Sequence, residues 1–353
     1  MSRNWKTLFF ALLAGASAAP PTDAGLPEPV IRARYLMGTR CEVRAFGPEA
    51  ETGAALDAAL DRIAALERVL TTWKPDGELA KLNTTVANGS KCGAPDGWQS
   101  LSSELTDAVN AALSWSGRTG GAFDPTLGAL LQAWGQKSGG RVPTVDERVV
   151  AQSKSGTRCL EFDRRRQRLC VRCVGVEFDL GGIGKGIALD RAAEVLKARG
   201  INNALLDFGG QVLALGAPPQ ERGWLIDIAD PRDRDKRVMT LQLRDKSVST
   251  SSNSERFFEQ DGKRYGHILD PRTGTPLATT DQVTVIADNA TDADAASTAL
   301  LVDPALRQQV AKLASGMTAI ALSPASNNQL ECWADSSALR SIVNREAAIR
   351  GCR

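Results

Sequence analysis

A single histidine limits the acid–base chemistry available to this chain of 353 residues. His267 stands in the segment Tyr-Gly-His-Ile-Leu-Asp-Pro-Arg-Thr-Gly, residues 265–274. Imidazole has an ordinary pKa near neutral pH, so any imidazole-based proton transfer must use this residue. One histidine cannot build a histidine-rich zinc or copper site. The alternative is a structural histidine at a strand end, but the rigid Asp-Pro-x-Thr-Gly turn that follows it favours a functional role.

A second segment, Asp-Leu-Gly-Gly-Ile-Gly-Lys-Gly-Ile-Ala-Leu-Asp at residues 179–190, combines four glycines with Lys185. Glycines allow backbone N–H groups to approach a ligand closely, and a helix N-terminus favours phosphate. The segment matches neither a Walker A loop nor the GxGxxG pattern. A plain strand–turn–helix connection is the alternative interpretation.

A third segment, residues 291–299, places Asp294 and Thr298 four residues apart and therefore on one helix face. A carboxylate beside a hydroxyl offers the hard oxygen ligands that magnesium takes. The alternative is a capping box, with Thr291 as the N-cap and Asp294 three residues later.

Three further segments are weak signals when taken singly. Residues 247–253 are rich in hydroxyls and include Thr250 and Ser251, which suit a phosphate-binding turn or a surface loop. Trp73 follows two threonines and could serve as an aromatic platform for a planar ligand. Asp124 lies in a Phe-Asp-Pro-Thr sequence.

The elements that must position these residues are read from hydrophobic periodicity and turn residues. Helices are predicted over 49–70, near 103–116, from just after residue 185 to 200, over 291–301 and over 304–314. Strands are predicted over 31–46, within 158–178, and over 203–207, 224–228, 238–243, 282–287 and 317–322. The mixture has no regular βαβ rhythm, which predicts an α+β fold with mostly antiparallel sheets and flanking helices.

The ends and the bulk composition bound the setting. Residues 1–18 have the charged start, apolar core and small-residue cleavage site of an export signal, and 19–30 form a Pro-rich linker before a domain over 31–345. An uncleaved membrane anchor is the less favoured interpretation of this segment. Because no cysteine lies near the cleavage region, a lipoprotein anchor is not indicated. The periplasm is the expected location. A net charge of +2 leaves no basic field for nucleic acid.

Seven cysteines suit an oxidising compartment and leave at least one thiol unpaired. Cys332 and Cys352 could staple the C-terminal tail. The Cys170-x-x-Cys173 pair resembles a redox motif, but structural disulfides are preferred, and their pairing stays open.

Taken together and in this order, the segments resemble the ApbE family of FAD:protein FMN transferases over about residues 31–325. The matching pieces are residues 37–39, 73–83, 123–126, 179–190, 207–210, 250–251, 267–274 and 293–299. The resemblance implies an ApbE-like architecture related to the T-fold, with two lobes around an FAD cleft. Departures from the family pattern include Gly184 for alanine, Ser252 for glycine and Trp73 for tyrosine.

The resemblance implies a role for each candidate residue. Asp294, Thr298 and the carbonyl of Gly182 would hold magnesium, with Lys185 near the phosphates. FAD, as substrate, would contact a set of residues that also includes His267: Met37, Trp73, Asp124, Asp179, Lys185, Thr250 and Ser251. His267 is the candidate base for the acceptor threonine, and Asp294 is the competing candidate.

The reaction implied is attack by a threonine of a target protein on the FMN-side phosphorus of FAD, releasing AMP. Acceptors in the family carry a Ser/Thr-Gly-Ala-Thr type motif and are subunits of membrane redox complexes or exported flavoproteins. This chain has no Gly-Ala-Thr sequence, so it resembles the modifying enzyme. Two alternatives stay open: a magnesium-dependent FAD pyrophosphatase that yields FMN and AMP, and a non-enzymatic FAD carrier.

Overall fold

A computed structural model describes residues 28–87, 92–94, 97–253, 256–325, 329–347 and 349–352. The predicted export signal and nearly all of the predicted linker lie outside the described residues. No described helix is both long enough and apolar enough to cross a membrane.

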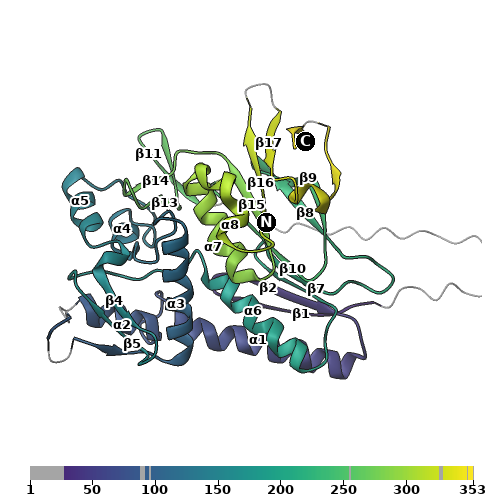
Figure 1. Cartoon of the computed structure of the whole chain (residues 1–353), viewed down its shortest axis with the longest axis horizontal. Coiled ribbons are helices and arrows are strands. Elements are labelled where there is room, and N and C mark those ends of the chain that lie inside the picture. Colours follow the sequence, from purple (N-terminus) through teal and green to yellow (C-terminus); the bar gives the residue numbers. More distant parts are fainter. Residues whose placement is uncertain are drawn as a thin grey trace, which may run out of the picture.

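The helices and strands form the mixed α+β fold shown in Figure 1. The α-helices are α1 (Glu49–Leu70), α2 (Glu78–Ala87), α3 (Ser103–Arg118), α4 (Gly128–Ala133), α5 (Val145–Ser153), α6 (Gly184–Ala198), α7 (Ala290–Val302) and α8 (Val310–Leu313). Short 3-10 helices are η1 (Thr157–Cys159), η2 (Pro304–Gln309) and η3 (Ala338–Ser341). The strands are β1 (Val30–Leu36), β2 (Thr39–Ala45), β3 (Gln99–Ser100), β4 (Leu160–Asp163), β5 (Arg168–Val171), β6 (Ala204–Phe208), β7 (Gln211–Leu215), β8 (Trp224–Asp230), β9 (Asp233–Leu243), β10 (Lys246–Ser252), β11 (Phe257–Gln260), β12 (Lys263–Gly266), β13 (Leu269–Asp270), β14 (Thr275–Pro276), β15 (Gln282–Ala287), β16 (Thr318–Pro324), β17 (Leu330–Ala334), β18 (Ile342–Arg345) and β19 (Ile349–Gly351).

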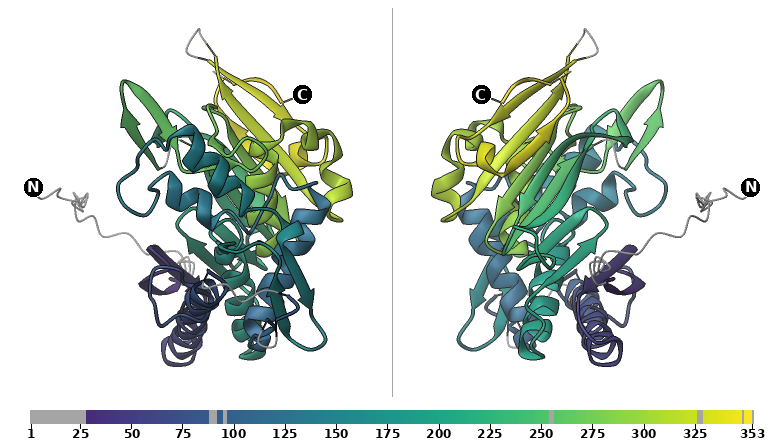
Figure 2. Two further views of the ribbon diagram at one scale, coloured as in Figure 1. Left: turned by 90° about the vertical axis from the view of Figure 1, so that its left-hand side faces the viewer. Right: turned by 90° about the vertical axis from the view of Figure 1, so that its right-hand side faces the viewer.

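A nine-stranded sheet in the order β1-β2-β6-β7-β10-β15-β16-β17-β19 is the backbone of the fold. Its neighbours run antiparallel except β17 and β19, which run parallel. Successive side chains of a strand point to opposite faces, and in the central strands β7 and β15 every residue is buried, so both faces of the sheet are covered there. One face packs under α1, α6 and α7 in the main hydrophobic core. The other face is covered by the three-stranded sheet β18-β9-β8, which closes a second core. The two views of Figure 2 show these layers from either side.

The remaining elements form a smaller lobe beside α1 and α6, on the left of Figure 1. It contains α2 to α5, the small sheet β3-β5-β4 and, at its upper edge, the hairpins β11-β12 and β13-β14. A small cluster around Leu130, Trp134 and Leu269 joins α4 to the second hairpin. The indole N–H of Trp134 donates to the carbonyl of Gly274 at 2.8 Å, which fixes the turn after His267 against α4.

Three disulfides settle the cysteine pairing. Cys332–Cys352 staples the C-terminal tail, as predicted. Cys92–Cys170 and Cys159–Cys173 lie in the smaller lobe, so the two cysteines of the Cys-x-x-Cys sequence bond to different partners. Cys41 is the free cysteine, and it is buried on β2.

Several predicted elements differ from the structure. The predicted strand over 31–46 is two strands, β1 and β2, because Met37 and Gly38 take left-handed backbone angles and turn the chain. The predicted helix over 304–314 is η2 followed by the single turn α8. Helix α6 begins at Gly184, one residue before Lys185. Within 158–178 only β4 and β5 are strands. The main sheet continues to Gly351, beyond residue 345.

The predicted capping box at Thr291 is wrong. Helix α7 begins one residue earlier, and the Asn289 side chain is its N-cap, accepting from the backbone N–H of Asp292 at 2.7 Å. The Asp294 side chain instead reaches out of its own helix.

Candidate functional site

Helices α6 and α7 cap each other through two aspartates. The Asp294 carboxylate, on α7, accepts from the backbone N–H of Gly186 in the first turn of α6 at 2.9 Å. The Asp190 carboxylate, on α6, accepts from the backbone N–H groups of Ala290 and Thr291 at 2.7 and 2.9 Å. First-turn N–H groups lack partners within their own helix, so each helix supplies what the other needs. The exchange fixes the glycine-rich N-terminus of α6 against the middle of α7.

The close approach of the two helices depends on one glycine. A Cβ at Gly186 would lie 2.3 Å from the carbonyl oxygen of Ala290, which is backbone and cannot move away cheaply. The small neighbours Ala293, Ala295 and Ala296 are fully buried on α7. Small side chains therefore bring Asp294 to the first turn of α6.

Burial defines the electrostatics of Asp294. Only 4% of the residue is exposed, and desolvation raises the pKa of its carboxyl. The Lys185 ammonium and the Gly186 N–H act in the opposite direction and favour the carboxylate. A nearby cation would offset the same desolvation, as is typical of carboxylates that hold metal ions.

Hydroxyl groups complete this cluster on β10 and α7. The Ser251 hydroxyl lies 2.8 Å from that of Ser297 and 3.4 Å from that of Thr298. Thr298 Oγ1 is also 3.4 Å from the position that a Cβ on Gly182 would occupy. The predicted metal residues Gly182, Asp294 and Thr298 thus lie on neighbouring segments, and Ser251 lies with them.

Thr250 does not join this cluster. Its hydroxyl bonds to that of Thr284 at 2.8 Å, across the β10–β15 pair. Successive strand residues point to opposite faces, so Thr250 faces the β8–β9 side while Ser251 faces α7. Thr250 and Ser251, both predicted to contact FAD, therefore lie on opposite faces of the sheet.

Met37 approaches the same end of α6. It occupies the β1–β2 turn with a φ of 45°, and its Cε lies 3.6 Å from the position that a Cβ on Gly184 would occupy. The left-handed backbone of this turn directs the thioether towards the α6 N-terminus. Met37 and Lys185 therefore flank one helix start.

A second cluster forms around Trp73, which is 67% exposed on the α1–α2 connection. The Lys137 ammonium lies 5.5 Å from the centroid of the Trp73 ring and 3.9 Å from the Asp179 carboxylate. The Asp179 carboxylate accepts from the backbone N–H of Gly181 at 2.9 Å and so shapes the loop before α6. Trp73 and Asp179, predicted separately, are brought together by a lysine that the sequence did not single out.

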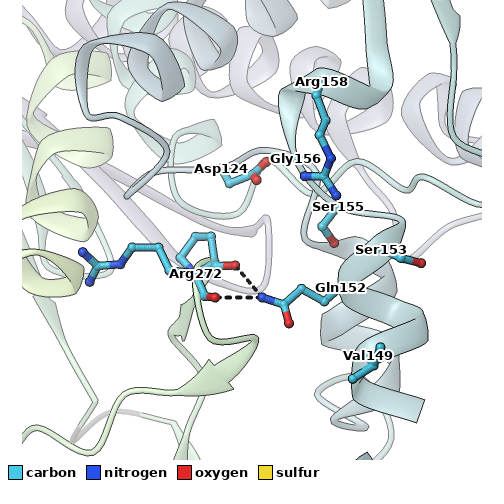
Figure 3. Close-up of a pocket in the computed structure, with 9 residues that line it drawn as sticks. Asp124, Val149, Gln152, Ser153, Ser155, Gly156, Arg158 and Arg272 are labelled. Carbon is cyan, nitrogen blue, oxygen red and sulfur yellow. Dashed lines mark hydrogen bonds between the residues drawn. The ribbon is translucent and has the colours of Figure 1, made fainter. Parts of the chain in front are cut away.

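Asp124 points into a pocket of about 440 Å³ between α5 and the turn that follows His267 (Figure 3). Its carboxylate accepts from the backbone N–H and the hydroxyl of Thr126 at 2.8 and 2.6 Å. Burial raises the pKa of Asp124, and the Arg158 charge works against that rise. In Figure 3 the Gln152 amide donates to the carbonyls of Pro271 and Arg272, closing one wall of the pocket.

His267 lies half-buried between β12 and β13. Its Nδ1 is 3.1 Å from the carbonyl oxygen of Arg256, to which its own backbone N–H also donates. A bond from Nδ1–H to this carbonyl would fix the tautomer that leaves Nε2 as the basic nitrogen. The preceding carbonyl, of Gly266, accepts from the Gln136 amide at 3.2 Å. Gln136 and Lys137 thus link the His267 segment to the Trp73 cluster.

Sequence reasoning missed Asp190, Lys137 and Gln136 as parts of the site. Asp190 was visible as the last residue of the glycine-rich segment. No local pattern marks Lys137 or Gln136, because their partners are distant in the sequence.

Comparison with known proteins shows which family the chain resembles. The model of the ApbE family matches residues 37–321. The FAD:protein FMN transferase of Treponema pallidum is 35% identical over 294 residues, which is 77% of this chain and 78% of that protein. The enzyme of the same name from Salmonella typhimurium is 31% identical over 299 residues, 82% of this chain and 83% of that protein. The crystal structure of the Pseudomonas stutzeri flavinyl transferase ApbE, in its apo form, superposes with a TM-score of 0.77 at 26% identity, covering 92% of this chain and all of that one. The ApbE protein of Thermotoga maritima superposes with a TM-score of 0.75 at 29% identity, covering 86% and 96%.

Proposed function

The chain belongs to the ApbE family, and we propose that it is a magnesium-dependent FAD:protein FMN transferase. A threonine hydroxyl of the acceptor forms a bond to the FMN-side phosphorus of FAD. The bond from that phosphorus to the AMP oxygen breaks, AMP leaves, and FMN stays on the acceptor as a phosphoester. The observation that carries the proposal is the convergence of Asp294, Thr298, Gly182 and Lys185 at the N-terminus of α6.

The donor set of this cluster fits magnesium. The Asp294 carboxylate, the Thr298 hydroxyl and the Gly182 carbonyl are all hard oxygen ligands, with no sulfur or imidazole among them. The buried Asp294 also gains from a neighbouring cation, since burial alone penalises its charged form. Magnesium, when bound, supplies neutralisation of the negative charge that develops as AMP departs.

The residues of the chain supply binding and positioning. Lys185, in the first turn of α6, suits the pyrophosphate of FAD, because its ammonium attracts the negative charge of phosphate. Met37 and Trp73 suit the planar flavin, which gains by stacking on an indole. Holding the donor and the threonine hydroxyl in one geometry accounts for much of the rate that such transfers need.

A base must take the proton of the acceptor threonine. His267 is our candidate, because imidazole accepts protons near neutral pH and the Arg256 carbonyl can orient its ring. Asp294 is the competing candidate, since a carboxylate at the metal can accept the proton as well.

The protein acceptor and the location belong to the proposal. We infer an acceptor with a Ser/Thr-Gly-Ala-Thr type motif, in a membrane redox complex or an exported flavoprotein. Export to the periplasm is supported by the signal-like sequence over residues 1–18 and by three disulfides, which persist in oxidising compartments.

The test incubates the mature chain with FAD, magnesium and an acceptor domain bearing the motif, and follows the acceptor by mass spectrometry. We expect a gain of one FMN on threonine that depends on magnesium. Free FMN and AMP without labelling would indicate the pyrophosphatase, and unchanged bound FAD would indicate the carrier.

The metal assignment is tested with Asp294→Ala. We expect no magnesium-dependent labelling from this variant, because it removes the charged oxygen ligand. Full labelling by chelator-treated enzyme would contradict the assignment.

A further inference from the structure

Lys137 joins three segments that are far apart in the sequence. It lies just beyond α4, and its ammonium donates to the hydroxyl of Thr72, on the α1–α2 connection, at 2.7 Å. The same ammonium lies 3.9 Å from Asp179, on the loop that leads into α6. These contacts converge beside the indole of Trp73, whose ring centroid is 5.5 Å away.

The indole of Trp73 needs such support. The residue is 67% exposed, so little packing holds its ring. Its backbone N–H donates to Thr71 Oγ1 at 3.2 Å, a bond that does not orient the side chain. A lysine ammonium over an indole is attracted by the negative face of the ring. Lys137 is in turn anchored by Thr72 and Asp179.

We propose that Lys137 is the positioning residue of the flavin platform: it covers one face of Trp73 and leaves the other to stack the isoalloxazine ring of FAD. The inference rests on the proposed function, because it assigns the flavin end of FAD to Trp73. Lys137 acts through Trp73 and is distinct from Lys185, which serves the phosphates. It therefore sets affinity for the flavin and not for the adenosine half.

The test compares Lys137→Met, which keeps the aliphatic stem and removes the charge, with Lys137→Arg, whose guanidinium also stacks on indole. Lys74→Met is the matched control. It also removes one positive charge beside Trp73. However, the Lys74 ammonium pairs with Glu67 at 3.2 Å, so this variant tests the loss of charge without the loss of the Lys137 contact to the ring. Riboflavin and AMP serve as separate probes of the two halves of FAD, and their dissociation constants are measured by titration without any acceptor.

We expect Lys137→Met to weaken riboflavin binding about threefold to tenfold, the range of a lost cation–π contact and its orientation. AMP binding should not change, Lys137→Arg should restore most of the riboflavin affinity, and Lys74→Met should match the unchanged chain. In a Trp73→Ala background, Lys137→Met should have no further effect.

Several results would overturn the proposal. These are equal weakening of riboflavin and AMP, an equal effect of Lys74→Met, or additivity of Lys137→Met with Trp73→Ala. Failure of riboflavin to bind the unchanged chain would also overturn it. The riboflavin and AMP titrations contain no acceptor and so do not depend on transfer. A failure of acceptor labelling in the separate transfer assay would therefore contradict the proposed function and leave this proposal standing.

Discussion

At the scale of single residues, His267 and Asp294 divide the work of the proposed reaction. The His267 ring, between β12 and β13, lies against the carbonyl of Arg256, whereas Asp294 lies buried against the start of α6. The two side chains therefore come from different elements and have different partners. Changes at each should have different signatures.

For His267→Ala we expect transfer to the acceptor to fall by about 100-fold or more, the usual contribution of a positioned base. FAD binding should be retained, because the residue is assigned to proton transfer. Parallel measurements of acceptor labelling and FAD retention check this. A collapse of FAD retention would make His267 a binding or structural residue.

Cys41 gives a pH-dependent prediction. Burial raises the pKa of its thiol from 9.0 to about 12, with smaller effects of the same sign from Asp207 and Glu42. The thiolate is the reactive form, so its fraction should rise tenfold per pH unit up to about pH 12. Alkylation of the folded chain should therefore be slow at pH 8 and should keep accelerating through pH 10. A plateau near pH 9 would show an ordinary, exposed thiol.

Site residues could be predicted from the sequence where both interacting residues lie in one short segment. Asp294 and Thr298 share a helix face, and that spacing alone indicated hard oxygen ligands. Lys137 was not readable, because its partners Thr72 and Asp179 are 65 and 42 residues away and no pairing pattern links them. The hydroxyl-rich residues 247–253 suit a turn or a surface loop in sequence, but 247–252 belong to strand β10, so Thr250 and Ser251 point to opposite faces.

At the scale of elements, the α6–α7 pair carries the site. Its two helices exchange caps and approach closely at Gly186, so the position of Asp294 depends on helix packing as much as on its own side chain. The apolar periodicity predicted both helices. It did not predict the exchange of caps, because each cap joins residues about 100 positions apart.

For Gly186→Ala we expect the free energy of unfolding to fall by about 2 kcal/mol or more, since the new methyl group would meet backbone atoms of Ala290. Gly117→Ala is the matched control, because a Cβ there meets nothing within 4 Å. As an exposed helical glycine, Gly117 should give a gain of about 0.5 to 1 kcal/mol on replacement. Urea unfolding of both variants checks the contrast; equal effects would show that α6 and α7 can move apart.

At the scale of the whole molecule, the two faces of the nine-stranded sheet pack against different elements. The face under α6 and α7 holds the candidate metal cluster, whereas the opposite face packs β8, β9 and the C-terminal tail. The fold class followed from the mixture of helices and strands. The tail strands beyond residue 325 did not, because they are short and held by a disulfide and a second core.

This separation predicts that the tail disulfide serves stability and not the site. Replacing Cys332 and Cys352 together by serine should cost about 2 to 4 kcal/mol of unfolding free energy, the usual range for a native bridge. FAD binding at 25 °C should not change, because both cysteines lie on the face away from α7. Thermal unfolding and FAD titration of the double variant are the measurements. A weaker FAD affinity would show that the two faces are coupled.

The first strand of the sheet, β1, affects whether one molecule can associate with another through its sheet edge. Among the described residues, β1 pairs only with β2, so its outer edge offers backbone groups to any passing strand. Arg32 and Arg34 point from β1 towards α1, where they bond to its acidic residues Glu49, Asp57 and Asp61. A strand added at this edge would have to lay its own side chains against that charged row. We therefore expect the arginines to disfavour edge-to-edge polymerisation, which becomes more favourable as the protein concentration rises.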